Sequence, residues 1–150
     1  MYIIQDELTD GRIDQLITAH RRDEGAFAAR KHSCPSINGF KKKDVTVWSV
    51  RDGEELLGCG ALKELSSEHG EIKSMRTAAL HMRKGVARYM LNHLLQEAKR
   101  RGYTRVSLET GAMAFFEPAR RLYESAGFQY CPPFGTYQED PNSLFMTKEL

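Results

Sequence analysis

The longest amphipathic pattern in the chain begins at residue 86 and ends near residue 101. Its apolar residues recur at the three-and-four spacing of one buried helical face: Val86, Ala87, Met90, Leu91, Leu94, Leu95 and Ala98. Basic residues fill the last turn, and Gly102 suits the position just after a helix end. The pattern predicts a helix that packs on a core by one face.

Shorter stretches alternate or concentrate apolar residues in the way that strands do. We expect strands at residues 2–4, 44–51, 55–62, 71–77, 103–109, 128–130 and 143–147. Asp52-Gly53 is a turn signal that joins the second and third of these as a hairpin, and Ser66–Gly70 is another turn. In the fourth strand, alternation places Glu71, Lys73, Met75 and Thr77 on one face and Ile72, Ser74 and Arg76 on the other.

Two further segments have helical character. Phe115–Ala126 has Pro118 in its first turn and Gly127 just after its end. Asp10–Lys31 reads as helical, in one or two pieces, and a loop follows it to residue 44. The order of elements predicts an α/β fold of one domain, residues 1–150, in which the strands at 71–77 and 104–109 are parallel because a helix connects them.

Composition narrows the function classes. A chain of 150 residues with 41% hydrophobic and 28% charged residues is typical of one globular domain. The net charge of +2 gives no general signature of nucleic-acid binding, and no apolar run is long enough to cross a membrane. The first residues have no signal-peptide layout, so we expect a cytoplasmic location.

The cysteines and histidines give little evidence of special chemistry. Cys34, Cys59 and Cys131 lack the close spacing of zinc ligands, and reduced thiols are the favoured interpretation. Cys34 follows His32 closely and is an alternative as a nucleophile, because a neighbouring imidazole activates a thiol. The histidines form no pair on one helical face, and we expect no metal.

The loop before the long helix, Met82–Arg88, is a candidate anion site. The first backbone N–H groups of a helix lack internal partners, and the helix dipole is positive there. Gly85 has no Cβ, so a ligand can approach the backbone, while Arg83 and Lys84 add positive charge. These features favour a phosphate or pyrophosphate, although an ordinary basic helix start fits the loop equally well.

Two motifs resemble one known family. HMRKGVA resembles the pyrophosphate loop of the GCN5-related N-acetyltransferases (GNAT), whose pattern is Q/R-x-x-G-x-G/A, with Met82 in place of the usual Gln or Arg. Ala119–Phe128, ARRLYESAGF, matches the family motif A-x-x-L-Y-x-x-x-G-F. The resemblance covers Glu71–Phe128, the hairpin at 45–62 fits the family's second and third strands, and residues 1–44 match only in outline. Two motifs in the right order are more specific than one glycine loop.

The resemblance implies a fold and a reaction. The fold has a central mixed, mostly antiparallel sheet flanked by helices, with parallel strands that splay at the cofactor site. The reaction is direct transfer of acetyl from acetyl-CoA to the amine of a small molecule or peptide in a ternary complex, without a metal, and a homodimer is a family habit. The implied cofactor-binding residues are Met75, Arg76, Thr77, Arg83, Lys84, Gly85, Val86, Ala87 and Arg88.

The resemblance also implies catalytic roles. Tyr123 takes the place of the family's general acid, which protonates the leaving thiolate, although helical spacing alone favours a core residue. Glu71 is the candidate general base, Glu109 on the neighbouring strand is the alternative, and either is equally compatible with a surface or ion-paired carboxylate. Some members deprotonate the amine through ordered water and need no dedicated base.

The acceptor is not specified by these motifs. Acceptor specificity is expected from residues 20–40 and from the loop at 131–141, where Phe134 and Tyr137 stand beside Glu139 and Asp140. That loop either holds a cationic amine or packs as an ordinary acidic turn. Gly58–Leu65 and Ser107–Gly111 resemble a bacterial subgroup described as acting on auxin-like or amine compounds, a label that does not transfer to this chain. A catalytically inactive acyl-CoA sensor is the alternative function, and an unrelated nucleotide-binding domain is disfavoured because its glycine motifs are missing.

Overall fold

The computed structural model describes residues 1–8, 11–17 and 44–150. The elements are, in order, β1 (Tyr2–Gln5), β2 (Val45–Asp52), β3 (Glu55–Glu64), β4 (His69–Thr77), η1 (Ala79–His81), α3 (Val86–Arg100), β5 (Arg105–Gly111), η2 (Ala114–Phe116), α4 (Glu117–Ser125), β6 (Gln129–Cys131) and β7 (Ser143–Glu149). Residues 12–17 are helical. The predicted strands and the two later helices are confirmed, with ends shifted by a few residues. The rest of the helical segment expected to residue 31, the following loop and Cys34 lie outside the described residues.

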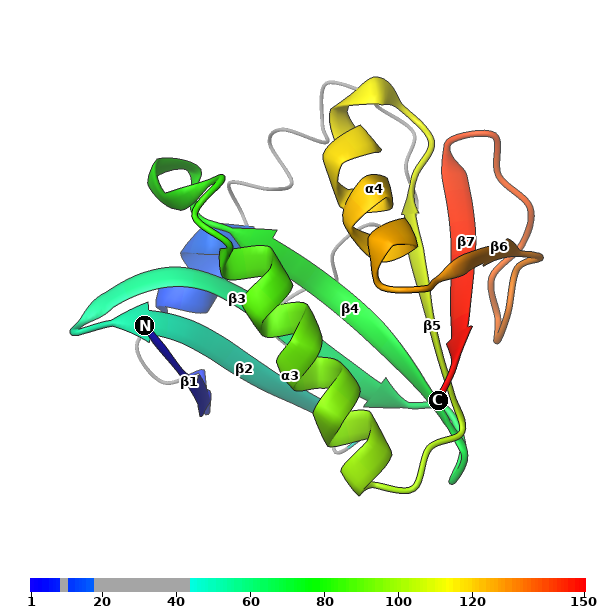
Figure 1. The fold of residues 1–150 in the computed structure, drawn as a ribbon, viewed down its shortest axis with the longest axis horizontal. Helices are drawn as coiled ribbons and strands as arrows, with labels where there is room; N and C mark the ends of the chain where they lie inside the picture. The colour runs from blue at the N-terminus through cyan, green and yellow to red at the C-terminus, as the bar shows by residue number, and fades with distance from the viewer. Residues whose placement is uncertain (9–10, 18–43) are drawn as a thin grey trace.

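The strands form one sheet of seven in the order β1-β2-β3-β4-β5-β7-β6. Every neighbouring pair is antiparallel except β4 and β5, which are parallel. The helix α3 connects these two strands, as the sequence predicts, because a chain that returns to a parallel neighbour must cross over the sheet. Figure 1 shows β4 and β5 together at one end and diverging toward the other.

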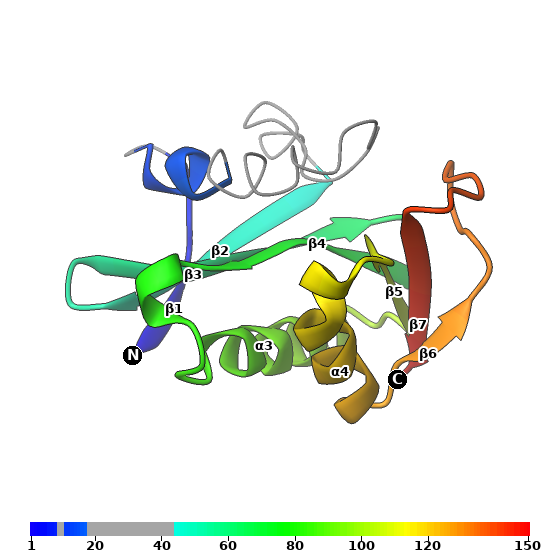
Figure 2. The same ribbon diagram turned by 90° about the horizontal axis from the view of Figure 1, so that it is seen from above.

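Helices cover both faces of the sheet. Figure 2 shows α3 and α4 on one face and the helical residues 12–17 on the other. The strands β2 and β3 are therefore buried on both sides: Trp48 and Val50 belong to the core beneath α3, whereas Val47 packs with Ile13 and Ile17. The alternation in β2 separates two buried faces rather than a buried face from an exposed one.

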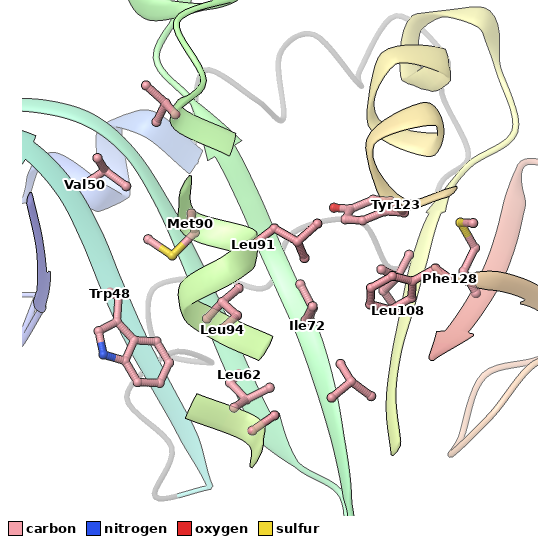
Figure 3. Close-up of a cluster of buried hydrophobic side chains, with 14 of the residues drawn as sticks. Trp48, Val50, Leu62, Ile72, Met90, Leu91, Leu94, Leu108, Tyr123 and Phe128 are labelled. Atoms are coloured by element: carbon pink, nitrogen blue, oxygen red, sulfur yellow. The ribbon is translucent and has the colours of Figure 1, made fainter. Parts of the chain in front are cut away.

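The helix α3 packs closely because glycine faces it. Its buried residues are Val86, Met90, Leu91, Leu94 and Ala98, whereas Ala87 and Leu95 are only partly buried. A Cβ at Gly60 of β3 would lie 2.7 Å from Cγ of Met90, so any larger residue would force the Met90 side chain to move. Gly102 follows the helix with a φ of 85°, as expected for the residue after a C-cap. Figure 3 shows this core between α3, α4 and the sheet.

The strand β4 departs from simple alternation at Ser74. This residue has a φ of 50°, and the pairing of β3 with β4 slips by one residue between Cys59 and Ala61. An extra residue in one strand is a β-bulge, which reverses the facing of every residue after it. Met75 consequently packs against the core beneath α3, and the prediction that it shares a face with Glu71 is wrong.

Candidate functional site

The loop Met82–Arg88, here called the anion loop, presents main chain at the start of α3. Gly85 is the N-cap with a φ of 83°, and no side chain caps the helix. The first N–H in the helix with a backbone acceptor belongs to Tyr89, which donates to Gly85 O over 3.0 Å, so the N–H groups of residues 86–88 have no acceptor within the helix. A Cβ placed at Gly85 meets no heavy atom within 4 Å. The loop therefore offers open backbone donors at a positive helix end.

Basic side chains surround these donors. Arg88 Nη2 donates to Ser125 Oγ over 3.2 Å, which links the start of α3 to the end of α4. Lys84 Nζ lies 3.2 Å from His81 Nδ1, and the other nitrogen of that imidazole lies 2.8 Å from Glu55 Oε1. Arg83 is exposed, with a φ of 65°. The predicted anion site is thus a backbone cradle with cations at its rim, and Met82, 59% exposed, occupies the position where the family pattern has a polar residue.

The parallel strands separate beyond the cradle. β4 and β5 pair from His69 with Arg105 to Ile72 with Leu108 and no further. Beyond Ile72, β4 pairs only with β3, while the end of β5 pairs only with β7. Within residues 1–8, 11–17 and 44–150, no strand takes the remaining main-chain hydrogen-bonding groups of residues 73–77, so this stretch has one unpaired strand edge. The predicted splay is confirmed, and Met75, Arg76 and Thr77 lie on it.

Glu71 stands where the strands separate, with its side chain only 4% exposed. Tyr137 donates its hydroxyl to Glu71 Oε2 over 2.6 Å, and Lys73 Nζ lies 3.6 Å from the same oxygen. Lys73 Nζ also donates to the Tyr137 hydroxyl over 3.4 Å. We call Glu71, Lys73 and Tyr137 the Glu71 cluster. A buried carboxylate needs such partners, because burial without them disfavours its charge.

An aromatic group holds Tyr137 in the cluster. Its ring centroid lies 5.2 Å from that of Phe134 and 5.5 Å from that of Phe145, and these two rings are 5.8 Å apart. Burial first, and then the nearby Glu71 and Glu109 carboxylates, raise the pKa of the Tyr137 hydroxyl above its ordinary value. The hydroxyl therefore stays protonated and acts as a donor. Tyr137 therefore contacts Glu71, which is distant in the sequence, and it also has Glu139 and Asp140 as sequence neighbours.

Tyr123 lies on the other face of the sheet, in α4. It is 7% exposed, and its ring packs edge-on against Phe128 with centroids 5.7 Å apart. Figure 3 shows its hydroxyl pointing away from α4 toward Leu91 of α3. Burial raises the pKa of this hydroxyl well above its ordinary value. Tyr123 is therefore a core residue whose hydroxyl stays protonated, and its role as general acid remains a prediction.

Glu109, the alternative general base, has a different hydrogen-bond donor from Glu71. It accepts a hydrogen bond from Ser143 Oγ over 2.6 Å, across the β5–β7 pair. A second polar chain runs nearby, from His69 Nε2 to Ser107 Oγ over 2.7 Å and on to Thr147 Oγ1 over 2.9 Å. Burial first, and then Arg105, lower the pKa of the His69 imidazole.

The sequence patterns did not predict that Lys73 and Tyr137 contact Glu71. Lys73 follows Glu71 by two residues on a strand, which was a usable signal, because such residues share a face. Tyr137 is 66 residues from Glu71, and no local pattern connects them. Arg76, one of the implied cofactor-binding residues, has its guanidinium 6.0 Å from the ring centre of Phe115.

The described residues also bear on the predictions about cysteines, metal ions and membrane spans. Cys59 is buried and its thiol donates to Ser74 O over 3.4 Å, whereas Cys131 is partly buried. Among residues 1–8, 11–17 and 44–150, no three His, Cys, Asp or Glu side chains are grouped so as to hold a metal ion. Nor does any helix in that part combine the length and hydropathy of a membrane span. The acceptor-binding region expected at residues 20–40 lies outside the described residues.

Known proteins are similar to this chain in sequence, in fold or in both. The chain is 53% identical over 152 residues to the uncharacterized N-acetyltransferase YsnE of Bacillus subtilis (strain 168), covering 100% of both chains. A crystal structure of an acyl-CoA N-acyltransferase from Klebsiella pneumoniae matches with a TM-score of 0.82 and 27% identity, covering 99% of this chain and 97% of the other. A Bacillus subtilis acetyltransferase in complex with CoA has the same fold, with a TM-score of 0.74 and 15% identity over 99% and 97% of the two chains.

The family assignment rests on sequence as well as fold. The model of the acetyltransferase (GNAT) family matches residues 9–128, which include the anion loop, the splayed strands and α4. Members of this family are acyltransferases that act on amines and use acetyl-CoA as the acetyl donor. The chain belongs to the GNAT family of N-acetyltransferases.

Proposed function

We propose that residues 1–150 form one domain that transfers acetyl from acetyl-CoA to an amine of a small molecule or peptide, by direct attack in a ternary complex. One observation carries the proposal. The strands β4 and β5 separate just beyond Ile72, next to the buried Glu71 carboxylate, while the Tyr123 hydroxyl lies on the other face of the sheet. In this proposal, Glu71 is the proton acceptor and Tyr123 is the proton donor, on opposite faces of the sheet.

The anion loop fits the pyrophosphate of coenzyme A. The N–H groups of Val86, Ala87 and Arg88 would donate to phosphate oxygens, because they lack acceptors in the helix. Arg83 and Lys84 would supply charge at the rim. The exposed edge of Met75–Thr77 would take the pantetheine arm and the thioester carbonyl, since main-chain N–H groups there have no strand partner on the β5 side.

The residues divide the chemistry of acyl transfer between them. Acetyl-CoA supplies the activated acetyl group and a thiol leaving group. A free alkylamine has a pKa of roughly 10 and must lose a proton before it attacks, so Glu71 would act as the general base. Main-chain N–H groups at the end of β4 would stabilise the carbonyl oxygen as charge develops on it. Tyr123 would donate a proton to the departing sulfur, because its raised pKa keeps it protonated.

Thiol release with a panel of amines tests the proposal. The protein is mixed with acetyl-CoA and, one at a time, with alkylamines, aromatic amines, amino acids and peptides that have free N-termini. We expect amine-dependent release of coenzyme A and an acetylated product by mass spectrometry. Tight binding of acetyl-CoA without release for any amine would contradict catalysis and support the alternative, an acyl-CoA-binding sensor with the same fold.

A further inference from the structure

Tyr137 binds the one oxygen of Glu71 that Lys73 also approaches. Both contacts fall on Oε2, at 2.6 Å from the tyrosine hydroxyl and 3.6 Å from the ammonium group. Among the described residues, no hydrogen bond is made to Oε1. The carboxylate is thus anchored at one oxygen, while the other keeps its capacity to accept a hydrogen bond. A base that is fixed in this way loses little orientational freedom when a substrate arrives.

We propose that Tyr137 is a positioning residue for the Glu71 carboxylate: it holds Oε2, so that Oε1 faces the acceptor amine. The inference rests on the proposed function, in which Glu71 is the general base. Tyr137 acts through Glu71 and takes no proton itself.

The surroundings of Tyr137 suit this role. Phe134 and Phe145 pack against its ring at centroid distances of 5.2 and 5.5 Å, so the hydroxyl has little freedom to leave Glu71. Phenylalanine at position 137 would keep these ring contacts and remove only the donor. The tyrosine lies in the loop between β6 and β7, and it therefore ties that loop to the β4 strand.

Several charged groups share the surroundings of Glu71. Lys63 of β3 is its cross-strand partner, and His69 and Lys73 lie on β4 itself. Glu109 of β5 is near enough to Tyr137 to influence its pKa, as Glu71 does. The pKa of Tyr137 is raised by burial first, so the hydroxyl remains a donor throughout the range in which a carboxylate titrates. Its loss removes the hydrogen bond that anchors Oε2 of Glu71.

Tyr137→Phe tests the inference in two ways. At saturating acetyl-CoA, kcat should fall by about tenfold, because an unanchored carboxylate spends less time in the orientation that accepts the proton. The Kd for acetyl-CoA should stay unchanged, because the anion loop is untouched. In a Glu71→Gln background the same change should have no further effect, because Tyr137 acts through Glu71.

Tyr130→Phe is the matched control. Tyr130 is 51% exposed and donates to Glu124 Oε2 over 2.8 Å, a tyrosine–glutamate pair with no contact to the Glu71 cluster. It should leave kcat and the Kd for acetyl-CoA unchanged. An unchanged kcat in a folded Tyr137→Phe protein overturns the positioning role alone. A fully active Glu71→Gln enzyme overturns the proposed base, and the positioning role with it.

Discussion

The anion loop and the Glu71 cluster are built in opposite ways. The anion loop is one continuous segment that presents main-chain N–H donors. Its conformation depends on Gly85, which has a φ of 83°. The Glu71 cluster brings together side chains from β4 and from a loop 66 residues away, and the carboxylate of Glu71 lies at its centre. Under the proposed function, the loop determines the affinity for the cofactor and the cluster determines the rate of acetyl transfer.

The largest expected effect is that of Glu71→Gln. The amide cannot accept the proton of the amine, so kcat should fall about a hundredfold. The affinity for acetyl-CoA should stay within about twofold, because the anion loop is untouched. Steady-state kinetics and isothermal titration calorimetry measure the two quantities. A pH–rate profile that keeps the wild-type limbs would exclude Glu71 as the base.

Tyr123→Phe should have the next largest effect. It keeps the ring in the core and removes the hydroxyl, so turnover should fall by more than about tenfold through loss of the proton donor. Thermal unfolding should change little, because the ring contact with Phe128 remains. Unchanged turnover with an intact fold would remove Tyr123 from the mechanism.

Gly85→Val tests the anion loop, with Gly53→Val as its control. Both glycines have a positive φ, 83° and 61°, and a Cβ at either meets no heavy atom within 4 Å. A left-handed conformation costs an L-residue about 1–2 kcal/mol, so both variants should lose similar stability. Only Gly85→Val should weaken acetyl-CoA binding, by about tenfold, because the side chain covers the backbone donors. Equal affinity in the two variants would contradict the cradle.

The smallest expected effect is that of Met82→Gln. The side chain at this position is 59% exposed, and the main chain provides the donors, so a polar group there should improve acetyl-CoA affinity by less than about threefold. A gain of tenfold or more, measured by the same calorimetry, would show that side-chain recognition exceeds backbone recognition at this loop.

The two regions also differ in how far the sequence predicts them. The anion loop and α3 follow from local periodicity, a glycine and the charges around it, all within about twenty residues. The parallel β4–β5 pair follows from the helix that connects the strands. Neither the bulge at Ser74 nor the bond from Tyr137 to Glu71 has a local signature, because a serine rarely adopts a positive φ and the hydrogen bond depends on the sheet order. The bulge changes the facing of Met75, which simple alternation misassigns.

The most direct test compares two variants in two measurements. Calorimetry gives the Kd for acetyl-CoA, and kcat at saturating acetyl-CoA gives the rate of chemistry, for Glu71→Gln and Gly85→Val. Separate roles predict that Glu71→Gln loses kcat with its Kd unchanged, and that Gly85→Val loses affinity with its kcat largely retained. If Kd and kcat change together in both variants, the division between the anion loop and the Glu71 cluster is contradicted.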